Sequence, residues 1–238
     1  METEFIFWRH ATSAGIQVEE ICGGEDKSAR LWKAMALQVF GENGGERYRE
    51  IGHYESGAPF MEDSQQRVSI SHTGHFMVIA MLPRTPEADL ERFSLRTAMG
   101  VDCEPIDREQ TLRVADRFMS ASELELTEAY AGQLMVGDAH HAPMEEAQAR
   151  VAATVLAWTI KEALYKAALT PGLDFRTCLR IESMPEICGN PLVRGFQAGR
   201  GRIIFPDGEV CEMSLFSYLS ENHVVTLAYS PKCAKFAR

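Results

Sequence analysis

The feature that most constrains this chain is a pair of short segments, about sixty residues apart, that together carry three carboxylates and an ammonium group. Side chains alternate between the two faces of a strand, so Asp102 and Glu104 in a predicted strand point the same way. Glu162 and Lys166 lie one turn apart in a helical pattern. If this strand packs against this helix, the four side chains meet. Such a set suits a hard divalent cation, such as Mg²⁺, and the phosphate that it neutralises.

The composition narrows the class of protein. The 238 residues are enough for one large domain or two modest ones with a substantial core. The 34 acidic residues outnumber the 24 lysines and arginines, and the resulting net charge of −10 argues against duplex nucleic acid as the main partner. The sequence has no apolar run of membrane-spanning length and no signal-peptide pattern, so we expect no membrane association. The six cysteines form no CxxC pair, so we expect reduced thiols and a cytoplasmic protein.

Strand and helix patterns occur on both sides of residue 97. Strands are predicted at residues 5–8, 67–72, 75–82, 98–104, 177–182, 201–205, 210–218 and 223–229. Helices are predicted at 28–40, 107–118, from 121 onward, and at 143–170. Ser120 and Glu123 form a predicted capping box at the start of the third of these helices. Residues 11–26 are predicted to be a polar loop that leads into a helix. The last strand echoes the one at 75–82, because each follows a polar turn. The sequence therefore predicts an α+β fold of two similar subdomains, 1–97 and 98–238.

A third segment supplies groups that can receive phosphate oxygens. Ser71, His72 and Thr73 lie where a predicted strand ends in a turn. Hydroxyls, backbone N–H groups and an imidazole can all donate hydrogen bonds to phosphate at such a place. Each motif alone has an ordinary structural explanation, such as a solvated strand face, a hydrogen-bonded histidine, or a surface ion pair between Glu162 and Lys166. Their combination in one chain favours a functional site.

In this order, the three segments resemble the motifs of the 4′-phosphopantetheinyl transferase superfamily. That family has a Ser-His turn, a Gly-Val-Asp-x-Glu strand and a Trp-x-x-Lys-Glu-Ala-x-x-Lys helix, which correspond to residues 71–72, 100–104 and 158–166. Residues 117–123 also resemble the family's Arg-Phe-(Ser/Ala)-x-x-Glu segment. The length of the chain is similar to that of the larger, surfactin-synthetase-activating type. The resemblance implies two similar α+β subdomains in one polypeptide, an active site in the cleft between them, and a monomer.

The resemblance also implies a reaction. The phosphopantetheine arm of coenzyme A would be transferred to a serine of an acyl or peptidyl carrier protein. Asp102, Glu104 and Glu162 would hold Mg²⁺ against the pyrophosphate, and Lys166 would contact a phosphate oxygen. Glu162 is also the candidate base for the serine hydroxyl, directly or through a metal-bound water. The catalytic residues implied are Asp102, Glu162 and Lys166. Carrier domains are typically acidic, so docking onto a chain of net charge −10 needs a local basic or apolar patch.

Contacts to coenzyme A follow from the same resemblance. Ser71, His72 and Thr73 would contact its phosphates, with His72 at the 3′-phosphate or the pyrophosphate. Lys27 and Arg30 are further candidates for the 3′-phosphate, because they lie near a predicted helix start.

The chain departs from the family at one position that bears on coenzyme binding. Members often have Gly-Lys-Pro ahead of the Ser-His strand, with the lysine near the nucleotide, whereas this chain has Gly57-Ala58-Pro59. Gly57 remains a candidate coenzyme contact, but Ala58 removes one cation. This loss leaves open a non-catalytic coenzyme A-binding module of the same fold. A Mg²⁺-dependent transferase with a nucleotide donor is another alternative, although the sequence contains no P-loop.

Overall fold

The computed structural model describes residues 7–11, 17–22, 51–53, 57–61, 66–73, 76–81, 97–137, 142–186, 198–219 and 222–233. The strands of the first half are β1 (Phe7–Ala11), β2 (Gln17–Cys22), β3 (Ile51–His53), β4 (Pro59–Met61), β5 (Gln66–His72) and β6 (Phe76–Met81). The second half contains β7 (Ala98–Pro105), α3 (Gln110–Arg113), α4 (Ala115–Phe118), α5 (Ala121–Val136), α6 (Glu146–Ala168), β8 (Leu179–Ser183), β9 (Gly199–Ile204), β10 (Val210–Leu219) and β11 (His223–Ser230). The predicted helix at 28–40, with Lys27 and Arg30, lies outside the described residues.

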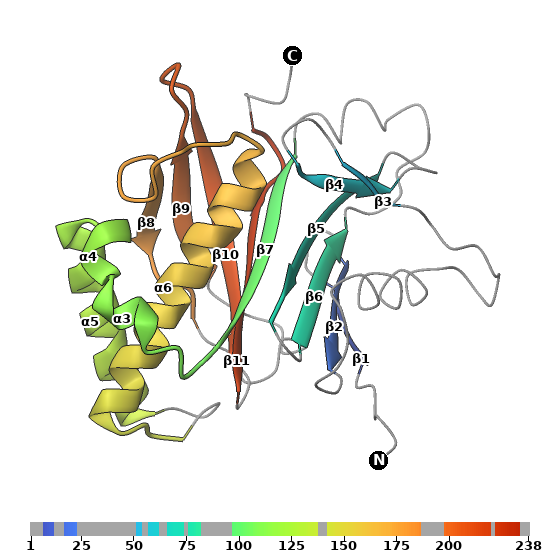
Figure 1. The fold of residues 1–238 in the computed structure, drawn as a ribbon. Coiled ribbons are helices and arrows are strands. Elements are labelled where there is room, and N and C mark those ends of the chain that lie inside the picture. The colour runs from blue at the N-terminus through green and yellow to red at the C-terminus, as the bar shows by residue number, and fades with distance from the viewer. Residues whose placement is uncertain are drawn as a thin grey trace.

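The strands form two antiparallel sheets (Figure 1). The first is six-stranded, in the order β1-β2-β6-β5-β4-β3, and the second is five-stranded, in the order β7-β11-β10-β9-β8. All the pairings between neighbouring strands are antiparallel. The mixture of helices and sheets confirms the α+β prediction at this level. The boundary at residue 97, the similarity of the two halves and the cleft between them stay predictions.

Strand β7 lies where the two sheets meet, at the edge of the five-stranded sheet and beside β5 and β6 (Figure 1). Its alternate residues Met99, Val101 and Cys103 belong to a buried apolar cluster that also includes Val78 and Ala80 of β6. Strand side chains alternate, so Gly100, Asp102 and Glu104 lie on the opposite side. The apolar alternation of this strand therefore turns both carboxylates away from that cluster.

Helix α6 covers the other face of the five-stranded sheet, with α5 packed beside it (Figure 1). Most of its residues are buried, and its small side chains let it approach β7 closely. A Cβ atom added at Gly100 would clash with the carbonyl oxygen of Ala163 and would lie 2.6 Å from the amide nitrogen of Ala167. The glycine before Val101 is thus required by the close contact between β7 and α6.

Helix α6 is shorter than the sequence predicted for residues 143–170. It begins after Glu145, because Glu145 has an extended backbone with φ of −65° and ψ of 149°, and the backbone N–H of Met144 donates to the carbonyl oxygen of Leu134 in α5. It ends at Ala168, because Leu169 has a left-handed backbone conformation with φ of 51°. That conformation is a common helix C-cap. Among the described residues, no helix is long and apolar enough to cross a membrane.

One prediction about the secondary structure is wrong, and another is confirmed only in part. Residues 17–22 are not a polar loop but strand β2, which pairs with β1 on one side and β6 on the other. Backbone pairing on both edges outweighs the weak strand propensity of its acidic residues. Residues 107–118 are not one helix but the two short helices α3 and α4, separated at Val114 with φ of −119° and ψ of 11°. The short strands β3 and β4 were not predicted.

Candidate active site

Asp102 is the centre of a buried polar cluster that joins both sheets to α6. Its side chain is on β7, and the residue is 4% exposed. Its Oδ1 atom accepts hydrogen bonds from Ser71 Oγ of β5 and from Lys166 Nζ of α6, both at 2.7 Å. Lys166 also donates to the carbonyl oxygen of Val101, at 3.1 Å. The structure therefore brings together Ser71, Asp102 and Lys166, which the sequence placed in three separate motifs.

The other oxygen of the Asp102 carboxylate, Oδ2, is buried and has no hydrogen-bond partner among the described residues. Leaving a buried carboxylate oxygen unpaired is costly, because it has lost water without gaining a donor. Such an atom at a site of clustered carboxylates is a natural position for a ligand that supplies positive charge.

Glu104 is held by two side chains that the sequence did not assign to the site. Its Oε1 atom accepts a hydrogen bond from Trp158 Nε1 at 3.1 Å and forms an ion pair with Arg108. The Arg108 guanidinium also lies over the Trp158 ring, 5.9 Å from its centroid. Trp158 packs against Phe118 and Phe175, and its indole N–H also orients Glu104. Trp158 lies four residues before Glu162, and this helical spacing places both on the same face of α6, which is the feature of the sequence that indicates a place for Trp158 at the site.

Glu162 completes the acidic group. Its pKa is raised to about 7, first by burial and then by the negative charges of Asp102 and Glu104, while the positive charges of Lys166 and Arg108 oppose the shift. The pKa of Glu104 is raised in the same way, first by burial and then by the charge of Asp102, with Arg108 acting in the opposite direction. Asp102 is therefore close enough for its charge to disfavour the ionised forms of Glu104 and Glu162.

Replacing Glu162 with glutamine should stabilise the cation-free protein above neutral pH. A carboxyl group whose pKa is raised in the folded state binds more protons there than in the unfolded chain, so its contribution falls as the pH rises from 4.5 to about 7. A shift of this size corresponds to at most about 3 kcal/mol, and partial solvent exposure reduces it. Urea unfolding in EDTA should therefore show the glutamine variant gaining roughly 1–3 kcal/mol at pH 8 and almost nothing at pH 4.5.

Glu125→Gln, at an exposed carboxylate of α5, is the control for this measurement. Its effect on the free energy of unfolding should be small and nearly the same at both pH values. A Glu162→Gln variant that gains equally at pH 4.5 and pH 8 would contradict the assignment of a raised pKa to this carboxyl group.

The three carboxylates fit a divalent cation in their chemistry, since oxygen ligands are what Mg²⁺ prefers. The unpartnered Asp102 Oδ2 and the mutual repulsion of the three groups both favour added positive charge at this place. Within the described part of the chain, however, no three such side chains already converge as a formed metal site. Lys166 and Arg108 instead neutralise Asp102 and Glu104. Two of the three carboxylates therefore already have a basic partner in the structure.

The predicted phosphate-binding turn is divided between two environments. Ser71 is buried and donates to Asp102, whereas the next residue, His72, is exposed. Thr73 Oγ1 lies 3.5 Å from Nε2 of His223. Two residues before Ser71 on β5, Ser69 Oγ accepts a hydrogen bond from the backbone N–H of Val101 at 2.9 Å. Ser69 and Ser71 thus connect β5 to the free edge of β7, and His72 is left facing solvent.

Gly57, the remaining coenzyme candidate in the described residues, is an exposed residue with φ of 82°. This is the left-handed region, which favours glycine. No described contact joins Gly57 to the carboxylate cluster, and its role stays a prediction together with those of Lys27 and Arg30.

A second buried ion pair anchors α6 just before Glu162. Lys161 is 0% exposed, and its Nζ atom donates to Glu123 Oε1 at 2.7 Å, to the carbonyl oxygen of Phe175 at 2.9 Å and to that of Leu179. Burial lowers the pKa of Lys161, and Glu123 opposes this shift. Glu123 Oε2 accepts from the backbone N–H of Ser120 at 2.7 Å, which confirms the predicted capping box. The sequence did not predict that the same glutamate also holds Lys161.

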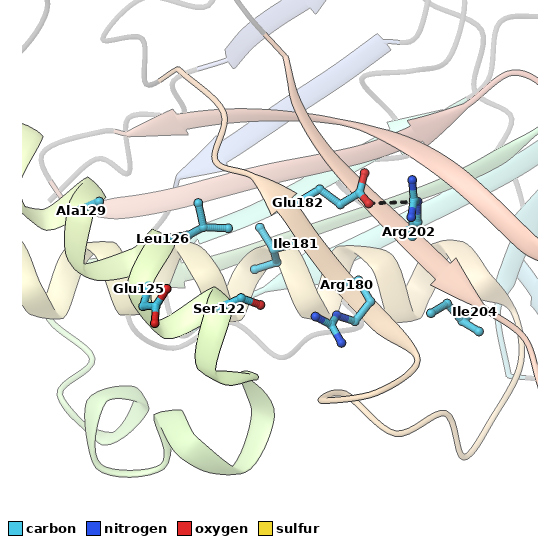
Figure 2. A pocket seen from close by; sticks show the side chains of 9 residues that line it. All are labelled: Ser122, Glu125, Leu126, Ala129, Arg180, Ile181, Glu182, Arg202 and Ile204. Atoms are coloured by element: carbon cyan, nitrogen blue, oxygen red, sulfur yellow. Dashed lines mark ion pairs between the residues drawn. The ribbon is translucent and has the colours of Figure 1, made fainter.

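A cavity of about 710 Å³ lies away from this cluster, between α5 and strands β8 and β9 (Figure 2). Its walls include Glu125 of α5, Arg180 and Glu182 of β8, and Arg202 of β9. Arg202 pairs with Glu182 at 3.0 Å, as the dashed line shows (Figure 2). None of the predicted site residues lines this cavity, so it is not part of the carboxylate cluster.

Carboxylates and an ammonium group that meet between a strand and a helix suit an enzyme that binds a divalent cation and charged groups of its substrate. Comparison with known families makes this class specific. The family model of the 4′-phosphopantetheinyl transferase superfamily matches residues 98–228, which is more than half of the chain. The protein therefore belongs to the 4′-phosphopantetheinyl transferase superfamily, a family of transferases that act on carrier proteins with coenzyme A. The match includes both the β7 and the α6 motif. No curated protein matches the chain significantly.

Proposed function

We propose that this protein is a Mg²⁺-dependent 4′-phosphopantetheinyl transferase that modifies an acyl or peptidyl carrier protein. Its place in the superfamily supports phosphopantetheinyl transfer in general. The observation that carries the more specific proposal is Asp102, whose buried carboxylate is held by Ser71 and Lys166 through one oxygen and has no described hydrogen-bond partner at the other. This arrangement suits a cation-assisted reaction at a pyrophosphate.

In the proposed reaction, the hydroxyl oxygen of a carrier serine attacks the phosphorus atom that bears the pantetheine arm. A new P–O bond forms to the serine, the pyrophosphate P–O bond breaks, and adenosine 3′,5′-bisphosphate leaves with the bonding electron pair. Glu162 accepts the proton of the serine hydroxyl. Asp102, Glu104 and Glu162 would hold Mg²⁺, which would neutralise the negative charge of the pyrophosphate.

Lys166 is the proposed phosphate-binding cation of α6. Its ammonium group is fixed by Asp102 and by the carbonyl oxygen of Val101, so it is oriented before substrate arrives. A lysine can hold a phosphate oxygen as a flexible point charge. His72, Thr73, Gly57 and the basic residues near 27–30 are proposed to contact the rest of coenzyme A, and the exposure of His72 is consistent with that role.

We further propose that the chain is of the larger, surfactin-synthetase-activating type. The presence of two separate antiparallel sheets in one polypeptide supports this proposal. It implies that one copy of the chain contains a complete site and works as a monomer, with coenzyme A bound between the halves 1–97 and 98–238.

The test is a transfer assay in which apo carrier proteins are incubated with coenzyme A and MgCl₂ and then weighed by intact-mass spectrometry. We expect a mass gain equal to the phosphopantetheine arm. The gain should be abolished by EDTA and by Asp102→Ala, and retained by Asp116→Ala at an exposed aspartate of α4. Coenzyme A binding without any mass gain would instead favour the non-catalytic binding module that Ala58 leaves open. Neither binding nor mass gain would overturn the proposed function.

A further inference from the structure

Arg108 is a basic side chain at the carboxylate cluster for which the proposed reaction has no use. It follows β7 by three residues, and its guanidinium turns back to Glu104 in an i,i+4 ion pair. The Glu104 side chain is 16% exposed and that of Arg108 is 39% exposed, so the carboxylate lies inside the site and the guanidinium at its rim. Arg108 and Trp158 both donate to the same oxygen, Oε1.

The main chain and the side chain of Arg108 are held very differently. Its backbone is fixed by a turn, because its N–H donates to the carbonyl oxygen of Pro105 and its own carbonyl oxygen accepts from the backbone N–H and the hydroxyl of Thr111. The guanidinium pairs with the Glu104 carboxylate and lies over the face of Trp158, and its charge also acts on the carboxyl group of Glu162. It can therefore leave Glu104 by side-chain rotation alone, without any change in the fold.

A divalent cation and a guanidinium cannot share one carboxylate without repelling each other. If Glu104 takes part in holding Mg²⁺, the positive charge of Arg108 on the same carboxylate opposes the cation, and opening the ion pair relieves that repulsion. The fraction of molecules in which Glu104 is free then scales the apparent affinity for the cation. Lys166 makes a similar pair with Asp102, but in the proposed reaction it is retained as a phosphate ligand.

We propose that Arg108 competes with the divalent cation for Glu104 and thereby sets the cation affinity of the site. This inference rests on the proposed function, because it takes Glu104 to be a cation ligand. The guanidinium keeps the acidic cluster neutralised while no cation is bound. It is released to solvent beside Trp158 when the cation arrives.

The test is isothermal titration calorimetry of MgCl₂ into the full-length, EDTA-treated protein. Arg108→Gln should lower the Kd for Mg²⁺ by roughly tenfold, the factor that corresponds to loss of a competing ion pair of about 1.4 kcal/mol. Arg108→Lys should lie between the two, because a lysine makes a single contact and stacks less well on Trp158. The matched control is Arg113→Gln, which removes another i,i+4 pair, with Glu109 at 3.7 Å, whose partners are 76% and 70% exposed. Its Kd should equal that of the wild type.

The outcomes separate this inference from the proposed function. If the wild type binds Mg²⁺ and Arg108→Gln binds it equally well or more weakly, the inference is overturned while the proposed function stands. If neither the wild type nor Arg108→Gln binds Mg²⁺, both are overturned. Binding by Arg108→Gln alone would support the inference strongly. Should the glutamine variant fail to fold by circular dichroism, the lysine variant decides in the same way: a lower Kd supports the inference and an unchanged Kd overturns it.

Discussion

Replacing Glu123 with alanine should lower the free energy of unfolding by roughly 3–5 kcal/mol, because it leaves a fully buried ammonium group without its counter-ion. Lys161 is 0% exposed and reaches the Glu123 carboxylate at 2.7 Å. The variant would also leave the backbone N–H groups of Ser120 and Ile181 without the acceptor that each now uses at 2.7 Å. Three donors therefore lose their partner in one substitution, in a part of the protein that water does not reach.

Urea unfolding at pH 7.5 measures this effect, and two further variants isolate its cause. Lys161→Met removes the buried ammonium group and leaves the Glu123 carboxylate with its two backbone donors and with Arg180, whose Nε lies 3.8 Å from Glu123 Oε1, so it should cost less than Glu123→Ala. Glu128→Ala, on α5 like Glu123, removes an exposed pair with Arg150 of α6 and should change stability by less than about 1 kcal/mol. If Glu123→Ala remains within 1 kcal/mol of the wild type, the buried pair does not hold α5 to α6 in solution.

The sequence predicted the parts of the site that depend on local periodicity. Alternation along a strand placed Asp102 and Glu104 on one side, and helical spacing placed Lys166 one turn beyond Glu162. The structure has Lys166 and Asp102 in contact at 2.7 Å. The capping box at the start of α5 was predictable for the same reason, since it involves only neighbouring residues.

The contacts that the sequence did not reveal depend on which side of an element is buried. Lys161 and Glu162 are adjacent charged residues on a helix, and periodicity alone does not say that the lysine turns into the core while the glutamate faces the cluster. The ring of Trp158 packs against Phe118 and Phe175, as a large aromatic side chain is expected to do, while its N–H binds Glu104. Strand β2 was not predicted because its two acidic residues have a low strand propensity, and its pairing with β1 and β6 cannot be seen in the sequence.

The division of the Ser-His turn follows from the same physical rule that the prediction used for β7. Successive strand residues face opposite ways, so Ser71 and His72 cannot both point at the same group. The structure has Ser71 against Asp102 and His72 exposed. The two residues are therefore suited to different parts of a ligand, with Ser71 acting through Asp102 and His72 available from the solvent side.

Replacing Gly100 with alanine should both destabilise the protein and abolish transfer. The added Cβ would clash with the carbonyl oxygen of Ala163 and lie 2.6 Å from the amide nitrogen of Ala167. Both are backbone atoms of α6, so no side-chain rotation can make room, and the helix has to move away from β7. Overpacking of this kind costs roughly 3 kcal/mol. The same displacement would separate Lys166 from Asp102, because one is on the helix and the other on the strand.

The measurement pairs urea unfolding with the carrier-protein mass assay. Gly132→Ala is the matched control, because this glycine is in the interior of α5 and a Cβ added there meets no described atom within 4 Å. That variant should be stabilised by roughly 0.5–1 kcal/mol and remain fully active. A Gly100→Ala protein with wild-type stability and transfer would mean that β7 and α6 are farther apart in solution, and that Asp102 and Lys166 need not be held in contact for the reaction. Loss of transfer together with lost stability, beside an intact Gly132→Ala protein, would establish the β7–α6 contact as the element that holds the site together.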